Sequence, residues 1–288
     1  MPKIIVITSG KGGVGKTTTA INLGAAMNYF GKDVLVIDAN LTTPNIGIHL
    51  GSPEVPINLN HILSGEAEAF EGVYEHESGL KVIPSSLSIK ELKTIMPEKL
   101  KDYKKDFKKI ADYIIVDSAA GLGNDAISAI DFADEIIIVS NPEMAAITDA
   151  LKAARVAGER KKDVLGVIMT RVRRDDIEMS PGTVKDMLEI PILGMIPEDM
   201  TVKEALNEKD AVVHVFPTSK AARAYKEIAS ELLGVEYNSK QDREKFMKRL
   251  LMALGLSKKP TKAKSADYSR KKSKRKDKKS KKKSKGKK

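Results

Sequence analysis

The chain has no cysteine, few aromatic residues and no long apolar run. The lack of cysteine excludes disulfides, thiolate catalysis and cysteine-ligated metal clusters, and it fits a reducing cytosol. Because no run reaches 18 apolar residues, we expect no membrane-spanning helix. Residues 1–20 lack a charged segment followed by an apolar core, so we expect no signal peptide. The four histidines are scattered, which argues against a metal site built from them: His49, His61, His76 and His214.

Charge is distributed unevenly along the 288 residues, whose net charge is +11. Residues 258–288 hold 18 Lys and Arg against two acids, a net charge of +16, so the other 257 residues carry −5. This Lys- and Ser-rich tail has almost no apolar residues, so we expect it to be disordered. A mildly acidic globule with a basic tail indicates an anionic partner.

Apolar segments alternate with helical patterns as far as residue 234. Several segments are apolar at nearly every position, which predicts strands covered on both faces. We therefore expect an α/β fold with a mostly parallel, doubly wound sheet. Strands are expected at 3–8, 33–38, 80–84, 112–117, 134–140, 163–169 and 191–196. Helices are expected at 16–30, 88–109, 124–132, 143–158, 181–189, 200–207 and 218–233.

The most informative segment, GKGGVGKT at 10–17, fits the phosphate-loop pattern G-x-x-x-x-G-K-[ST] between a predicted strand and a predicted helix. Glycines let the backbone wrap a phosphate, and the helix N-terminus offers free N–H groups. Lys16 would reach the β- and γ-phosphates, and the Thr17 hydroxyl would bind Mg²⁺. The predicted ATP- or ADP-binding residues are Gly10, Lys11, Gly12, Gly13, Val14, Gly15, Lys16, Thr17 and Thr18.

Two predicted strands run directly into aspartates, Asp38 and Asp117. Both carboxylates should emerge at the carboxyl edge of the sheet, where open α/β folds bind ligands. Beside a phosphate loop, such aspartates commonly contribute to a Mg²⁺ site, so Thr17, Asp38 and Asp117 are the predicted metal site. The alternative is that each aspartate caps the N-terminus of the next helix.

The loop and its extra Lys11 resemble the deviant Walker A ATPases, which include MinD, ParA, the nitrogenase iron protein and the Mrp-type carriers. Four more segments resemble MinD, so the resemblance covers about residues 1–257. The absence of cysteine counts against the iron–sulfur relatives. The four segments are VIDANLTTPNIG at 36–47, VDSAAGLG at 116–123, SNPEMAAITDA at 140–150 and GMIPEDMTV at 194–202.

This resemblance implies a face-to-face homodimer with ATP, in which Lys11 enters the partner's site and acts in catalysis with Lys16. It also implies that Asp149 can hold Lys11 when ATP is absent. Asn45 and Asp149 lie where relatives engage regulators. Relatives contact adenine at positions that match Arg171, Pro197, Glu198 and Asp199.

The chain departs from the family at its first switch, which usually reads D-x-D but here reads Asp38-Ala39-Asn40. Asn40 can hydrogen-bond a water but cannot accept its proton. Our hypothesis is that Asn40 slows hydrolysis and prolongs the ATP dimer, so that Asn40→Asp should accelerate hydrolysis. The alternative is a neutral variation in which another group orients the water.

A connector at 235–242 leads to 243–257, REKFMKRLLMALGLS. Five of its apolar side chains gather within about 140° of a helical wheel, whereas Met252 and Leu256 lie off that stripe. A short basic amphipathic helix is typical of an interfacial anchor, and this one resembles the membrane-targeting sequence of MinD. The alternative is a last helix docked on the protein's own core. The predicted membrane residues are Phe246, Met247, Leu250, Leu251 and Leu254.

Together these features predict an ATPase domain at 1–234, the connector, the membrane helix and a tail at 258–288. We expect a MinD-like, Mg²⁺-dependent, slow ATPase, cytoplasmic and peripheral on the inner membrane face. As an ATP homodimer it would bind anionic membrane and, with unidentified regulator and cargo proteins, position division, motility or polar machinery. The alternatives are a ParA-like ATPase whose tail binds DNA, a slowly hydrolysing nucleotide-binding scaffold, and a tail that only confers solubility.

Overall fold

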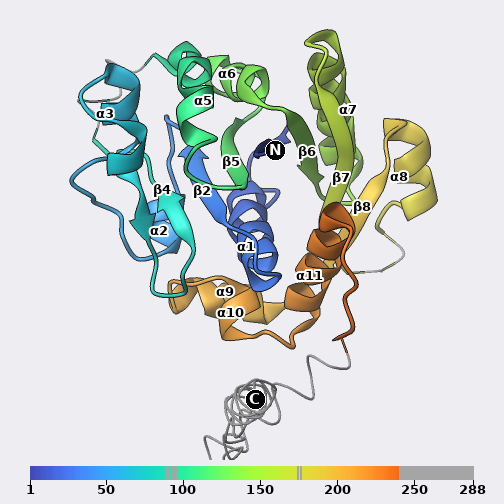
Figure 1. Ribbon diagram of the computed structural model, residues 1–288. Helices are drawn as coiled ribbons and strands as arrows, with labels where there is room; N and C mark the ends of the chain where they lie inside the picture. The colour runs from blue at the N-terminus through green and yellow to red at the C-terminus, as the bar shows by residue number, and fades with distance from the viewer. Residues whose placement is uncertain (89–90, 92–95, 174, 176, 240–288) are drawn as a thin grey trace, which may run out of the picture. The chain divides into compact units, whose positions relative to one another are not determined.

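A single eight-stranded sheet runs through the protein, in the order β3-β4-β2-β5-β1-β6-β7-β8 (Figure 1). The computed structural model describes residues 1–88, 91, 96–173, 175 and 177–239. Neighbouring strands pair in parallel except at one edge, where β3 is antiparallel to β4. The predicted mostly parallel sheet is confirmed. Its strands are β1 (Lys3–Ser9), β2 (Val34–Ala39), β3 (Tyr74–Glu75), β4 (Lys81–Ile83), β5 (Tyr113–Ala120), β6 (Glu135–Ser140), β7 (Asp163–Val172) and β8 (Ile192–Pro197).

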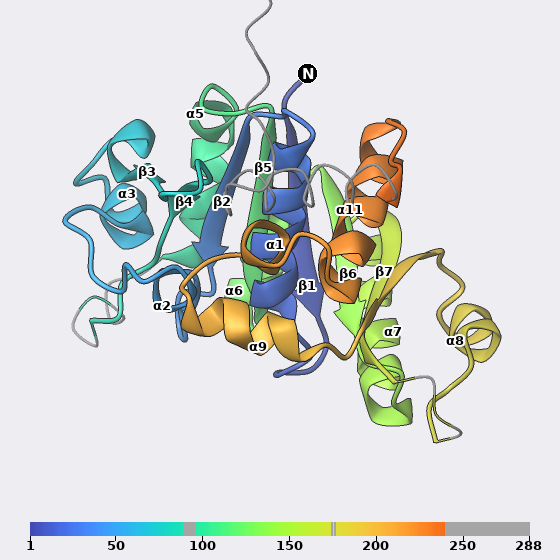
Figure 2. The ribbon, with the colours of Figure 1, turned by 90° about the horizontal axis from the view of Figure 1, so that it is seen from below.

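Helices cover both faces of this sheet (Figures 1 and 2). Along β1, Ile5 and Ile7 pack into a core shared with α1 and α11, whereas Ile4 and Val6 pack into a core shared with α6 and α7. The alternation follows from the two-residue period of a strand. The helical elements are α1 (Lys16–Tyr29), α2 (Ile46–His49), α3 (Leu59–Ser64), η1 (Ala69–Gly72), η2 (Pro97–Tyr103), α5 (Lys104–Phe107), α6 (Asn124–Phe132), α7 (Met144–Glu159), α8 (Pro181–Leu188), α9 (Met200–Asn207), α10 (Val212–Val215) and α11 (Lys220–Leu233).

All seven predicted strands are present, with ends shifted by a few residues. The long helix expected at 88–109 is wrong in its described part, which holds the 3₁₀ helix η2 followed by the short α5. Pro97 explains this difference, because proline starts a helical segment but interrupts one that would run through it. The two-residue β3 and the short elements α2, α3, η1 and α10 were not predicted.

The predicted membrane helix at 243–257 and the basic tail at 258–288 lie outside the described residues. Within the described ranges, no helix is long and apolar enough to cross a membrane. The predicted ATPase domain ends near the end of α11, where Gly234 caps the helix in the left-handed conformation.

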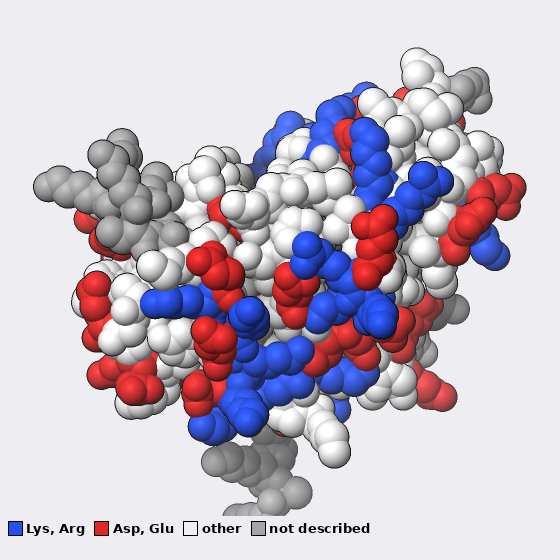
Figure 3. All heavy atoms as spheres, turned by 90° about the horizontal axis from the view of Figure 1, so that it is seen from above, with Lys and Arg blue, Asp and Glu red and all other residues white. Residues whose placement is uncertain are grey.

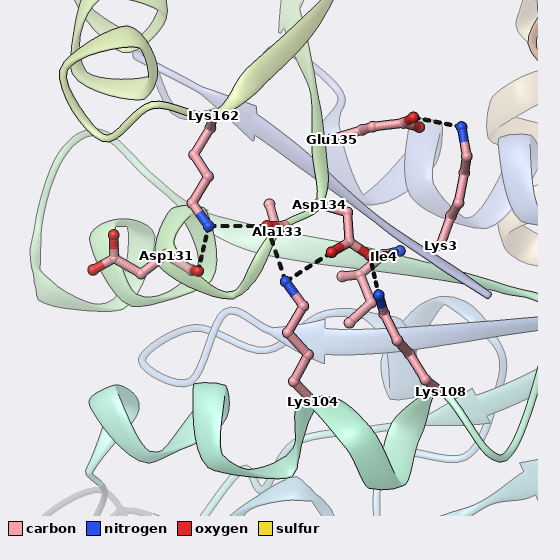
Figure 4. Close-up of polar contacts among 9 residues, drawn as sticks. All are labelled: Lys3, Ile4, Lys104, Lys108, Asp131, Ala133, Asp134, Glu135 and Lys162. Carbon is pink, nitrogen blue, oxygen red and sulfur yellow. Dashed lines mark hydrogen bonds and ion pairs between the residues drawn. The ribbon is translucent and has the colours of Figure 1, made fainter. Parts of the chain in front are cut away.

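Ion pairs connect neighbouring elements at the amino-terminal edge of the sheet. Positive and negative side chains interleave on the surface there (Figure 3). Asp134 lies 2.8 Å from Lys104 Nζ and 2.7 Å from Lys108 Nζ, and it accepts the Ile4 N–H at 3.0 Å (Figure 4). Lys162 donates to the Asp131 and Ala133 carbonyls at the end of α6. These contacts link α5 to β1, and the end of α6 to the residue before β7.

Candidate functional site

The loop between β1 and α1 has the shape expected of a phosphate cradle. Gly13 and Gly15 have φ values of +78° and +93°, a conformation in which glycine is favoured. Gly15 precedes α1, and no side chain caps this helix end. The N–H groups of the first turn and the positive end of the helix dipole are therefore available to an anion.

One helix, α7, and one other strand, β7, pack against this loop. An added Cβ at Gly10 would lie 2.1 Å from the Asp149 carbonyl oxygen, so only glycine allows α7 to approach so closely. On the other side, Thr170 of β7 donates from its hydroxyl to the Val14 carbonyl at 2.6 Å. The cradle is therefore preorganised by backbone packing and by one buried hydroxyl.

Both strand-end aspartates reach the site. Asp38 of β2 and Asp117 of β5 are register partners on adjacent strands, and both are fully buried. Thr17 Oγ1 donates to Asp117 Oδ2 at 2.5 Å, while Asp117 Oδ1 is buried and has no hydrogen-bond partner within the described structure. The three residues predicted to form the metal site therefore converge at one end of the phosphate loop.

Electrostatics favour a cation between these carboxylates. Burial, together with the nearby charge of Asp117, raises the pKa of Asp38 to about 8, and burial raises the pKa of Asp117 to about 6. In the described chain, no three His, Cys, Asp or Glu side chains are placed to cage a metal. Mg²⁺ needs no such cage, because it commonly binds through one or two carboxylates, waters and substrate phosphates. The orphaned Asp117 oxygen fits that ion.

Asp38 also organises the loop that follows it. Its carboxylate accepts the backbone N–H groups of Asn40, Asn45 and Ile46, at 3.2, 2.8 and 2.9 Å. The last two lie at the start of α2, whose N-cap is Asn45, so Asp38 binds this helix end from outside and is not itself the N-cap residue. We call residues 40–46 the switch I loop.

Asn40 is buried and its side chain is bound within this loop. Its Nδ2 donates to the Thr43 carbonyl at 2.5 Å, and its Oδ1 accepts from the Thr43 N–H and hydroxyl at 3.3 and 3.1 Å. Asn45 Nδ2 donates to the same carbonyl at 2.7 Å. Within the same turn, Thr42 Oγ1 donates to Asp125 at the start of α6, at 2.6 Å.

The two lysines of the phosphate loop differ in environment. Lys16 is buried, and this burial lowers the pKa of its ammonium group against the opposing effect of Asp117. Lys11 is nearly half exposed and lies 3.6 Å from Glu143. Asp149 is instead paired with Lys152 at 3.0 Å. The structure therefore does not show the Lys11–Asp149 contact that the resemblance implies, although it places Asp149 against Gly10.

Next to the loop lies a cavity of about 630 Å³, which opens beside Gly15 and Thr18. All four predicted adenine-contact residues line it: Arg171, Pro197, Glu198 and Asp199. Two of them already have partners in the protein. Asp199 caps α9 through the Thr201 N–H, and Glu198 forms an ion pair with Arg173. Arg171 lines the cavity with its backbone in the left-handed conformation, at φ +54°.

Several lining residues were not predicted, because no local pattern marks them. They come from α1, α2, β7 and the segment 207–233, which only the folded chain brings together: Asn22, His49, Thr170, Asp210 and Tyr225. The Tyr225 hydroxyl, buried beneath the cavity, lies 3.4 Å from Thr19 Oγ1 of α1.

Comparison with known proteins agrees with this geometry. The family described as AAA domain matches residues 2–161. An uncharacterized ATP-binding protein of Methanocaldococcus jannaschii is 36% identical over 252 residues, covering 87% of this chain and 96% of that protein. The septum site-determining protein MinD of Buchnera aphidicola is 31% identical, and the match covers 87% of this chain and 99% of that protein. The structure of MinD with Mg-ADP from Pyrococcus horikoshii superposes with a TM-score of 0.77 at 34% identity. The superposition covers 81% of this chain and 96% of that one.

Proposed function

The chain belongs to the MinD/ParA family of P-loop ATPases, and from that premise we propose that it is an Mg²⁺-dependent ATPase whose ATP-bound dimer binds a membrane reversibly. The observation that carries the proposal is the meeting of the phosphate loop, Thr17, Asp38 and Asp117 beside a cavity large enough for a nucleoside. This arrangement supplies positioning and charge compensation, which are what phosphoryl transfer requires from a protein.

Within one protomer, each group has a distinct task. The N–H groups of residues 10–18 hold the phosphates of ATP or ADP, and Lys16 neutralises charge on the β- and γ-phosphates. Thr17, Asp38 and Asp117 hold Mg²⁺, which would neutralise phosphate charge when bound. Arg171 and Pro197–Asp199 line the space for the base. The buried Tyr225 lines that space.

The second protomer completes the site. Lys11 is exposed enough to leave Glu143, and as a single surface ion pair this contact costs little to break. In an ATP dimer Lys11 would extend to the partner's phosphates and act with Lys16 in stabilising charge. Asn45 and Asp149 match positions at which relatives engage regulators, and they are proposed to contact regulator proteins here.

Turnover is proposed to be slow. Position 40 holds an amide, which cannot take a proton from water, and that amide is already bound to Thr43. A loose transition state still allows hydrolysis without a strong base. Slow turnover would prolong the ATP dimer and therefore its time on the membrane.

Membrane binding is assigned to residues 243–257, after the 1–234 ATPase domain and the 235–242 connector. One short amphipathic helix binds weakly, whereas a dimer presents two, and this avidity couples ATP binding to attachment. The protein would then be peripheral on the inner face of the cell membrane and would position cargo such as division, motility or polar machinery. The proposed lipid-facing residues are Phe246, Met247, Leu250, Leu251 and Leu254.

Sedimentation with anionic liposomes tests this proposal. The full chain should sediment with ATP and Mg²⁺ and remain largely free with ADP. Leu250→Glu should abolish sedimentation while leaving ATP hydrolysis intact. Equal sedimentation with ADP and ATP would argue against the switch.

A second candidate is a ParA-like ATPase that binds DNA, and the 18 Lys and Arg of residues 258–288 favour it. Lysines bind DNA phosphates without sequence preference and with steep salt dependence. Deleting 258–288 separates the two functions. A DNA-binding ATPase should lose DNA affinity, whereas a membrane-binding one should keep part of its liposome binding through Phe246, Leu250 and Leu254.

A further inference from the structure

We propose that Asn40 is a positioning residue whose amide, together with that of Asn45, clamps the turn of the switch I loop. The clamp, rather than any action on the attacking water, is then what residue 40 contributes to hydrolysis. This inference rests on the ATPase function proposed above and deepens it.

The clamp is centred on the Thr43 carbonyl. This oxygen accepts Asn40 Nδ2 at 2.5 Å and Asn45 Nδ2 at 2.7 Å, so both of its lone pairs are used. At the other end of the Asn40 amide, Oδ1 accepts the Thr43 N–H and hydroxyl. Both ends of the side chain are therefore committed to one residue.

The partners of Asn40 require an amide at this position. One end faces a carbonyl, which needs a donor, and the other faces an N–H, which needs an acceptor. An aspartate would still accept the Thr43 N–H, but it would set a carboxylate oxygen, which has no proton to donate, against the Thr43 carbonyl. Asn40 is 7% exposed, so water has little access to relieve that repulsion.

The clamped turn joins the parts of the site that have to act together. Asp38, at one end of the loop, binds the N–H groups of Asn45 and Ile46. Thr42, at the tip of the turn, binds Asp125 in the first turn of α6. That helix follows the segment 116–123, which resembles the second switch of the family. A looser turn would thus uncouple the metal-binding Asp38 from α6.

This geometry reverses the expectation drawn from the sequence for Asn40→Asp. The hydrolysis rate at saturating ATP should fall about 5- to 10-fold, the equivalent of one net hydrogen bond. The half-saturating ATP concentration should change by less than about 2-fold, because the phosphate loop and the base cavity keep their contacts.

The experiment compares Asn40→Asp with two matched variants of the full chain. Asn45→Asp removes the second donor to the same carbonyl without altering position 40. Asn28→Asp makes the same charge change at the carboxyl-terminal end of α1, where the Asn28 side chain donates a long, 3.5 Å bond to the Lys32 carbonyl. Single-turnover hydrolysis gives the rate and half-saturation, and hydrogen exchange of the nucleotide-free protein reports on residues 38–46.

If the clamp acts as proposed, Asn40→Asp and Asn45→Asp both hydrolyse ATP about 5- to 10-fold more slowly than the unmodified chain. In both variants the amide hydrogens of the switch I loop exchange faster by a similar factor. Asn28→Asp matches the unmodified chain in both measurements. Faster hydrolysis by Asn40→Asp overturns the proposal. Loss of rate in Asn40→Asp alone, with unchanged exchange in both variants, also overturns it and assigns Asn40 to the water. If the unmodified chain does not hydrolyse ATP, the proposed function fails, and the exchange arm still tests the clamp.

Discussion

Replacing Asp117 with Asn should stabilise the metal-free protein while weakening its response to Mg²⁺ and ATP. Asp38 and Asp117 are buried register partners on adjacent strands. Their pKa values are raised, to about 8 and about 6, first by burial and, for Asp38, also by its neighbour's charge. Because these folded-state values exceed the ordinary carboxylate value, their contribution to stability is full at acid pH and is lost as the pH rises through them.

The magnitude follows from the strand spacing. Two like charges about 5 Å apart repel by about 3 kcal/mol at an effective dielectric constant of about 20. The new amide replaces the orphaned Oδ1 with a donor, which offsets about 1–2 kcal/mol of this relief. At about pH 9, above both pKa values, both carboxylates are ionised. There a net gain of about 1–2 kcal/mol corresponds to a Tm increase of about 3–6 °C.

Calorimetric unfolding in EDTA, and again with Mg²⁺ and ATP, measures both halves of the prediction. Asp112→Asn, which makes the same charge change at an exposed position just before β5, is the control and should leave both Tm values near those of the unmodified chain. A Tm in EDTA at or below that of the unmodified chain would refute the repulsion argument. An undiminished Tm rise with Mg²⁺ and ATP would remove Asp117 from the metal site.

Three further substitutions test other parts of the structure. Lys11→Ala should abolish ATP-dependent dimerisation in size-exclusion chromatography and lower hydrolysis at least about 100-fold, whereas Lys152→Ala, the neighbouring surface cation, should not. Thr170→Val should raise the Kd for ATP about 5- to 10-fold in nucleotide titrations, because the Val14 carbonyl loses its donor. Asp134→Asn should lower the free energy of unfolding in denaturant by about 2 kcal/mol at pH 7 and by nothing near pH 2. Burial opposes ionisation of Asp134, but Lys104, Lys108 and the Ile4 N–H hold its pKa at about 2. The stabilisation is therefore lost as the pH falls through that value.

The sheet could be predicted from the sequence because its strands are apolar on both faces and most are flanked by helical patterns. The short elements could not. β3 has two residues and α2 has four, too few for a period to show. The predicted helix at 88–109 was wrong in its described part, where Pro97 instead begins a 3₁₀ helix.

The phosphate loop and the two strand-end aspartates were predicted because their chemistry is tied to short motifs. The sequence also places Asp38 and Asp117 at one edge of the sheet, but only the strand order makes them neighbours. Lys11 pairs with Glu143, whereas Asp149 pairs with Lys152, and no motif indicates which acid a lysine side chain approaches. Likewise, the hydrogen bonds of Asn40 depend on a turn that the sequence alone does not define.

The ion-paired edge around Asp134 offers a stationary reference for measuring movement elsewhere. Since the chain has no cysteine, each introduced cysteine is a unique attachment point for a spectroscopic label. Lys105→Cys on the exposed side of α5 would carry one label on the fixed edge, and Ile48→Cys, at a 43% exposed position of α2, would carry another beside the switch I loop. Distance distributions between the two labels, recorded with ADP and with ATP, would then report the displacement of that loop directly.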